Sequence, residues 1–145
     1  MREAEMEYAA TQIRRLPWVD PDNVFVLGTS EGGLAVATTR GRSFKGYIVT
    51  AWTCRQDYLT EMQGLWVPMD KPVLAIVYAD DPWFPNPWQR GHCGERFGPR
   101  KGSRSIVLPG RGHSVAGAPE ARSAVLDFLR QHTTRRPDAL APVQR

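Results

Sequence analysis

The sequence predicts one α/β domain, in which about four mostly parallel strands are flanked by helices. Four short apolar runs are separated by segments that show helical periodicity or many turn residues. None of these runs alternates cleanly between apolar and polar residues, which is typical of parallel strands covered by helices on both faces. The chain has 145 residues, 41% of them hydrophobic, which is enough for one hydrophobic core.

The predicted strands occupy the apolar runs 24–27, 47–49, 73–78 and 106–108. Helices are predicted where apolar side chains recur with a helical period, in residues 3–16 and again after Pro119. A short helix is predicted over 31–39. The segment 82–103, rich in proline and glycine, is predicted to be a long loop with room for a short helix, and 133–145 a disordered tail.

Composition excludes several classes of protein. The net charge is +4, with four of the surplus basic residues in the last sixteen positions and the others interspersed with acids. The short basic cluster Arg96, Arg100, Lys101 and Arg104 is interpreted as part of a loop, so no nucleic-acid partner is expected. The longest apolar run, 73–79, is far below the roughly 20 residues of a membrane span. As written, the chain has no secretory signal and is expected to be cytoplasmic. A periplasmic or secreted location would require a signal in a longer N-terminus.

A candidate nucleophile follows the first predicted strand. Residues 28–32 read Gly-Thr-Ser-Glu-Gly and match G-x-S-x-G at a strand-to-helix turn, which is too sharp for side chains on either side of the serine. Such a turn raises the hydroxyl of Ser30 above the sheet and aims the backbone N–H of Glu31 at the oxyanion that forms during attack. A serine that caps a helix after a glycine turn is the alternative interpretation.

A serine nucleophile needs a base that a third group orients. Asp80 and Asp81 follow the third predicted strand, and His113 follows the fourth in a glycine-rich loop. These positions meet at the carboxyl ends of parallel strands, where open sheets place their sites. An Asp-Asp-Pro turn and a loop histidine are each common without any function. Their order, serine then acid then histidine, favours a hydrolase site.

With these motifs the chain resembles the α/β-hydrolase superfamily, most closely its dienelactone-hydrolase-like and prolyl-oligopeptidase-like branches. The motifs are G-T-S-E-G-G at 28–33, Y-A-D-D-P-W at 78–83 and G-R-G-H at 110–113. The resemblance implies Ser30 as nucleophile, His113 as base and Asp81 as acid, with Asp80 as the alternate. It also implies cofactor-free hydrolysis of an ester, thioester or related acyl bond of a small molecule. Because dienelactone hydrolases use a cysteine nucleophile, Ser30 points to general acyl hydrolysis.

The resemblance covers residues 1–132 and implies a truncated, partial α/β-hydrolase fold. In the family the nucleophile follows the fifth of eight strands, whereas here one predicted helix precedes its strand. The loop that supplies a second oxyanion donor is expected to be missing, and loss of one donor typically costs about 10²- to 10³-fold in rate. The alternative function is therefore an inactive remnant that serves as a binding module. The strand 24–27 is expected to be an exposed edge at which copies of the chain associate.

Two further groups of residues have open interpretations. Cys54 and Cys93 follow neighbouring strands at one edge of the sheet, so they can form a disulfide, and two free thiols are the alternative. A zinc site built from His92, Cys93 and His113 would lack a fourth ligand, so no metal is expected. Five aromatic residues can wall an acyl pocket or pack as loop core, and core is preferred: Trp52, Trp66, Trp83, Phe84 and Trp88.

Overall fold

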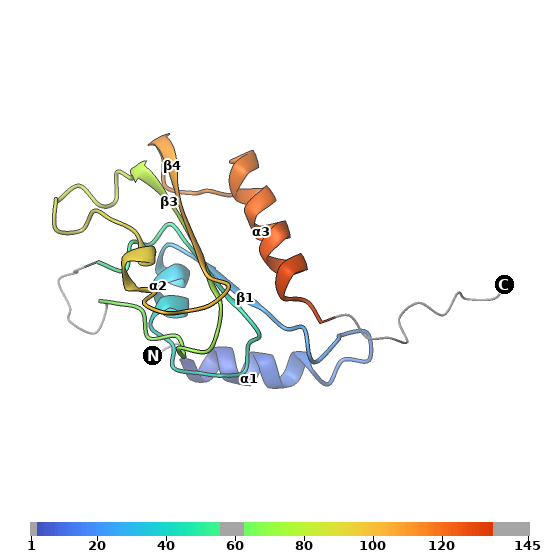
Figure 1. Cartoon of the computed structure of the whole chain (residues 1–145). Helices are drawn as coiled ribbons and strands as arrows, with labels where there is room; N and C mark the ends of the chain where they lie inside the picture. The colour runs from blue at the N-terminus through green and yellow to red at the C-terminus, as the bar shows by residue number, and fades with distance from the viewer. Residues whose placement is uncertain (1–2, 56–62, 135–145) are drawn as a thin grey trace.

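A parallel four-stranded sheet in the order β1-β2-β3-β4 forms the centre of the computed structural model, which describes residues 3–55 and 63–134. The strands are β1 (Val26–Thr29), β2 (Tyr47–Thr50), β3 (Val73–Asp80) and β4 (Arg104–Arg111). The helices are α1 (Glu3–Ile13), α2 (Glu31–Ala37), the 3-10 helix η2 (Cys93–Arg96) and α3 (Pro119–His132) (Figure 1). The predicted α/β class is confirmed.

Side chains of the central strands enter two separate cores because successive residues of a strand point to opposite faces. On one face, Val49 of β2 packs in a cluster that includes Ala10 of α1 and Val36 of α2. On the other face, Ile48 of β2 packs in a cluster with Phe128 of α3. Figure 1 shows α3 on one side of the sheet and α2 on the other. The result is a three-layer arrangement of helix, sheet and helix.

The two outer strands differ from the expectation that helices cover both faces of every strand. β2 is buried along its whole length, and so are the first five residues of β3. In contrast, Leu27 of β1 is 53% exposed and Val107 of β4 is 46% exposed. Apolar runs this short suit an edge strand and a central strand alike, so the expectation of full cover was wrong for β4, whereas the exposure of β1 agrees with the exposed edge expected at 24–27.

Several predicted boundaries also shift. β1 begins at Val26 instead of Val24 and continues through Gly28 to Thr29. The first predicted helix ends at Ile13 because the chain turns there, with the N–H of Leu16 donating to the carbonyl of Ile13 at 3.0 Å. The second predicted helix ends at Ala37.

The predicted tail lies almost entirely outside the described residues. Its first two residues are described, and Thr134 exchanges two hydrogen bonds with the side chain of Asn23, at 2.8 and 2.9 Å. The disorder predicted for 135–145 remains a prediction.

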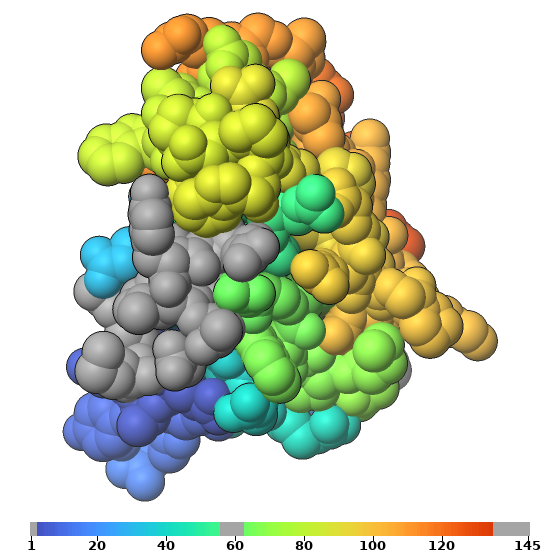
Figure 2. All heavy atoms as spheres, turned by 90° about the vertical axis from the view of Figure 1, so that its left-hand side faces the viewer, coloured from blue at the N-terminus to red at the C-terminus, as the bar shows by residue number. Residues whose placement is uncertain are grey.

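Within the described ranges, no helix is long and apolar enough to cross a membrane. On the face shown in Figure 2, the segment after β3, coloured yellow-green to yellow, covers the upper part, and α1, coloured blue, lies at the bottom.

An apolar hollow of about 360 Å³ lies between β1 and α3. Leu27 contributes from the strand, Val125 and Leu126 contribute from the helix, and Val115 comes from the segment between β4 and α3. Leu27 and Leu126 are both exposed. β1 is also an outer strand of the described sheet, so its outward backbone groups have no strand beside them within these ranges. An exposed strand edge next to apolar side chains favours association of one chain with another.

We predict that the chain associates with a second copy through β1, and that Leu27→Lys shifts it to a monomer. A lysine on an edge strand opposes pairing because its charge would have to be desolvated. Size-exclusion chromatography with light scattering measures the change. Val107→Lys on the opposite outer strand is the matched control and should leave the association unchanged. A monomeric wild-type chain, or association that survives Leu27→Lys, contradicts the prediction.

Candidate active site

Ser30 lies at the sharp turn between β1 and α2 in a strained backbone conformation. Its φ is 57° and its ψ is −118°, on the positive-φ side that non-glycine residues rarely adopt. Such a residue costs about 1–3 kcal/mol and persists only where its surroundings hold it. The N–H of Ser30 donates to the carbonyl of Thr50 on β2 at 3.0 Å, and its own carbonyl accepts the N–H of Leu34 at 2.9 Å. Strand and helix therefore fix the backbone on both sides of the hydroxyl.

Two glycines allow this turn, and they are not both members of the G-x-S-x-G motif. A Cβ atom on Gly28 would lie 2.0 Å from the carbonyl oxygen of Gly32. A Cβ atom on Gly33 would lie 2.6 Å from the carbonyl oxygen of Thr50. A Cβ atom on Gly32 would meet nothing within 4 Å. The crowded glycine after the serine is therefore Gly33, where α2 begins to pack on β2, and the motif's second glycine has room for a side chain.

His113 links Ser30 to Asp81. Its Nε2 lies 2.8 Å from the Oγ of Ser30, and its Nδ1 lies 2.7 and 2.9 Å from the two carboxylate oxygens of Asp81. The glycine before the histidine fixes this loop, since the N–H of Gly112 donates to the carbonyl of Asp80 at 3.3 Å and a Cβ there would lie 2.7 Å from the ring of Tyr78. The loop is held against β3, so Gly112 serves close packing at this point.

The two adjacent aspartates have different surroundings. The side chain of Asp81 is 2% exposed, and its Oδ1 also accepts the N–H of Trp83 at 3.0 Å. The side chain of Asp80 is half-exposed and lies 3.8 Å from Arg111 and 4.0 Å from Arg90. Because neighbouring residues at a strand end point in different directions, one of the two carboxylates reaches His113. In this structure that carboxylate belongs to Asp81.

A disulfide joins the loop after β2 to η2. Cys54 and Cys93 are both fully buried, and their Cα atoms lie 4.8 Å apart. The bond ties the long segment after β3, which begins with Asp81, to the carboxyl end of β2. The sulfur of Cys93 is thereby unavailable as a zinc ligand. Among the described residues, no group of three His, Cys, Asp or Glu side chains could hold a metal ion.

Two of the five aromatic residues agree with the core interpretation. Trp52 and Phe84 are buried, and their rings meet edge to face with centroids 5.6 Å apart, so these two belong to the core. Trp66, Trp83 and Trp88 are exposed. The rings of Trp83 and Phe84 also contact His113, which the sequence motifs did not predict, although their position directly after Asp81 and Pro82 indicates that they lie near the acid.

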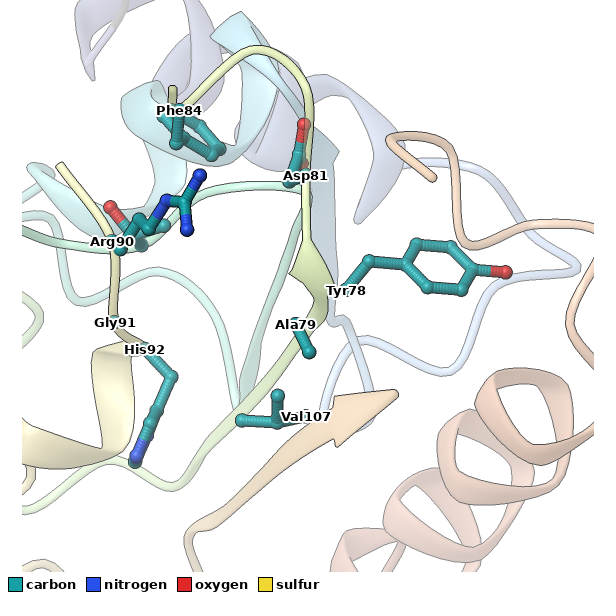
Figure 3. Close-up of a pocket in the computed structure, with 9 residues that line it drawn as sticks. Tyr78, Ala79, Asp81, Phe84, Arg90, Gly91, His92 and Val107 are labelled. Atoms are coloured by element: carbon teal, nitrogen blue, oxygen red, sulfur yellow. The ribbon is translucent and has the colours of Figure 1, made fainter. Parts of the chain in front are cut away.

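A small hollow of about 170 Å³ lies on another side of Asp81. Figure 3 shows its walls: Asp81 and Phe84 follow β3, Val107 comes from β4, and Arg90 and His92 come from the segment that leads to η2. His92 is held there because its Nδ1 lies 3.0 Å from the hydroxyl of Ser105. The hollow has mostly apolar walls with a few polar side chains, and it has the volume for water or a small group beside the buried acid.

Comparison with solved structures finds SOBER1 of Arabidopsis thaliana and its F65L variant. Both match with a TM-score of 0.50 and 16% sequence identity over 90% of this chain. The chain spans about three fifths of their length, 61% of the variant and 60% of the other structure. Comparison of the sequence with family models and with curated proteins finds no match.

The likeness to SOBER1 concerns the fold of this chain. Together with the parallel sheet and its flanking helices, it gives the chain a partial α/β-hydrolase fold, as the motifs implied. At 16% identity the match shows the fold alone, and it does not support the dienelactone-hydrolase branch to which the motifs pointed.

We predict that replacing both Cys54 and Cys93 by alanine lowers the free energy of unfolding by about 4 kcal/mol. The two cysteines are 39 residues apart, and a cross-link of that span removes this much loop-closure entropy from the unfolded chain. Denaturant unfolding without reducing agent measures the difference. Wild type unfolded and refolded with a reductant is the control and should approach the variant's stability. A loss below about 1 kcal/mol would contradict the prediction.

Proposed function

We propose that this chain is a serine hydrolase that cleaves an ester, thioester or related acyl bond of a small molecule. The observation that carries the proposal is the continuous set of contacts from the Oγ of Ser30 through both nitrogens of His113 to the buried carboxylate of Asp81. A hydroxyl, an imidazole and a carboxylate in this order form a nucleophile, a base and an orienting acid. The partial α/β-hydrolase fold supports the same conclusion.

The proposed reaction begins when the Oγ of Ser30 attacks the carbonyl carbon of the substrate. Nε2 of His113 accepts the hydroxyl proton, and Asp81 accepts the hydrogen bond from Nδ1–H and stabilises the imidazolium. The carbonyl oxygen becomes an oxyanion beside the backbone N–H of Glu31, the first residue of α2. Nε2 then returns its proton to the leaving oxygen or sulfur as the bond to the carbonyl carbon breaks. The acyl group remains on Ser30.

The second half of the reaction releases the acyl group. Nε2 of His113 takes a proton from a water molecule, whose oxygen attacks the acyl carbon of the Ser30 ester. The second oxyanion collapses, the bond to Oγ breaks, and the proton returns to Ser30. The products are a carboxylic acid and the alcohol or thiol released in the first half. The proposal requires no cofactor and no metal ion, since all proton transfers go through His113.

A binding module without turnover is the second candidate function. The observation in its favour is that the chain spans about three fifths of the length of SOBER1, so two fifths of that fold have no counterpart in the match. A hydrolase that is missing an oxyanion donor would retain the side-chain contacts around Ser30 and lose rate. Labelling of the serine separates the two candidates.

We predict that a fluorophosphonate probe labels Ser30 and no other serine. A phosphonyl group reports a nucleophilic hydroxyl even where turnover is slow, because a single attack suffices. Peptide mapping by mass spectrometry should find the adduct on Ser30 and lose it in Ser30→Ala. The control is Ser123→Ala on the exposed surface of α3, which should label as wild type does. An unlabelled, folded wild-type chain would favour the binding module.

We also predict that Asp81→Asn lowers kcat for p-nitrophenyl acetate by about 10³- to 10⁴-fold, because an amide favours the wrong tautomer of His113. Asp80→Asn is the matched control at the adjacent position, and it should leave kcat within about threefold, since Asp80 contacts arginines at the surface. Steady-state hydrolysis measures both variants. Equal losses, or a larger loss in Asp80→Asn, would assign the wrong carboxylate.

A further inference from the structure

The four residues from Asp81 to Phe84 form a tight turn that starts at the buried carboxylate. The carbonyl of Asp81 accepts the N–H of Phe84 at 3.0 Å, and its Oδ1 accepts the N–H of Trp83 at 3.0 Å. Pro82 occupies the second position, where its fixed φ suits the turn. The directions of both aromatic residues are therefore tied to the carboxylate that contacts His113.

Both aromatic rings contact the imidazole. The ring centroid of Trp83 lies 5.5 Å from that of His113 with 37° between the planes, and the centroid of Phe84 lies 6.1 Å away with 57° between the planes. Phe84 is buried and also packs on Trp52, so it has a role in the core. Trp83 is 69% exposed despite its contact with His113. Its side chain adds little to the core, and the contact with the imidazole is what distinguishes it from an ordinary exposed tryptophan.

We propose that Trp83 is a positioning residue for His113. Its ring limits rotation of the imidazole, keeps Nε2 directed at Ser30, and reduces access of water to the hydrogen bond between Nδ1 and Asp81. This inference rests on the proposed hydrolase function, in which His113 is the base. It goes beyond that function because it assigns a role to a side chain outside the three reacting groups.

The contact with Trp83 also favours the protonated imidazole that forms during attack. An aromatic face within about 6 Å of a cation attracts it. Neutral His113 gains less from the ring than the imidazolium does, so the contact is stronger in the transition state than in the ground state. Asp81 is in direct contact with His113, while Asp80 and Arg111, which lie 3.8 Å from each other, and Glu31 are the charged neighbours of the three site residues along the chain. These groups stay the same when Trp83 is replaced.

The test compares Trp83→Ala and Trp83→Phe with wild type. We expect Trp83→Ala to lower kcat for p-nitrophenyl acetate about three- to tenfold with KM nearly unchanged, and Trp83→Phe to restore most of kcat because it retains an aromatic face. Trp18→Ala is the matched control, since Trp18 is 78% exposed and precedes β1 at the other end of the strand. It should behave as wild type.

A second measurement does not depend on turnover. The Nδ1–H proton of His113, hydrogen-bonded to a buried carboxylate, should give a downfield proton NMR signal that exchanges slowly with water. Exchange should become faster in Trp83→Ala and stay at the wild-type rate in Trp83→Phe and Trp18→Ala. If wild type is not labelled by the fluorophosphonate, the hydrolase proposal fails, while the exchange rates still test the role of Trp83.

Three results would overturn the inference. Equal exchange rates in wild type and Trp83→Ala would show that the ring does not protect the contact with Asp81. A raised KM with unchanged kcat would make Trp83 a wall of the substrate pocket instead of a positioning residue. Equal losses in Trp83→Ala and Trp18→Ala would reduce its effect to that of any exposed tryptophan.

Discussion

Burial of both faces of β2 and of the first part of β3 is the constraint on which the rest of the structure depends. Parallel strands cannot be joined by tight hairpins, so each connection must cross over the sheet before the next strand begins. The crossover from β1 to β2 supplies α2, which covers one face together with α1 from before β1, and α3 from after β4 covers the other face. Every strand then ends at the same edge of the sheet. The segments that carry Ser30, Asp81 and His113 follow three of these ends and therefore meet.

The geometry around Ser30 depends on this buried centre in a second way. A residue with positive φ needs support, and the support comes from the carbonyl of Thr50 at the end of the buried strand β2. The small size of Gly28 and Gly33 lets α2 approach the strands closely enough for that contact. The disulfide between Cys54 and Cys93 then fastens the segment after β3 to the same strand end. The nucleophile, the acid and the aromatic residues that follow the acid are therefore all positioned relative to β2.

The outer strands β1 and β4 are less buried than the central strands. Leu27 on β1 and Val107 on β4 are as apolar as residues of the central strands, and both are exposed. Beside β1 this leaves an apolar hollow against α3, on the same side as the segment that follows His113. The match to SOBER1 covers about three fifths of that chain, so its fold contains substantial polypeptide with no counterpart in the match. The same small sheet therefore has an exposed apolar edge at β1 and, at its carboxyl end, the hydrogen-bonded side chains of Ser30, His113 and Asp81.

The sequence by itself determined the features that depend on local pattern. Apolar runs bounded by turns located the four strands, helical periodicity located α3, and the order of Ser30, the paired aspartates and His113 located the candidate site at three strand ends. Tertiary structure decided the features that depend on which distant segments meet. The choice of Asp81 over Asp80 depends on which carboxylate turns inward at the end of β3. The pairing of Cys54 with Cys93, the exposure of β4, and the contact of Trp83 with His113 likewise depend on long-range packing, since no local pattern encodes which side chain a residue will face across the sheet.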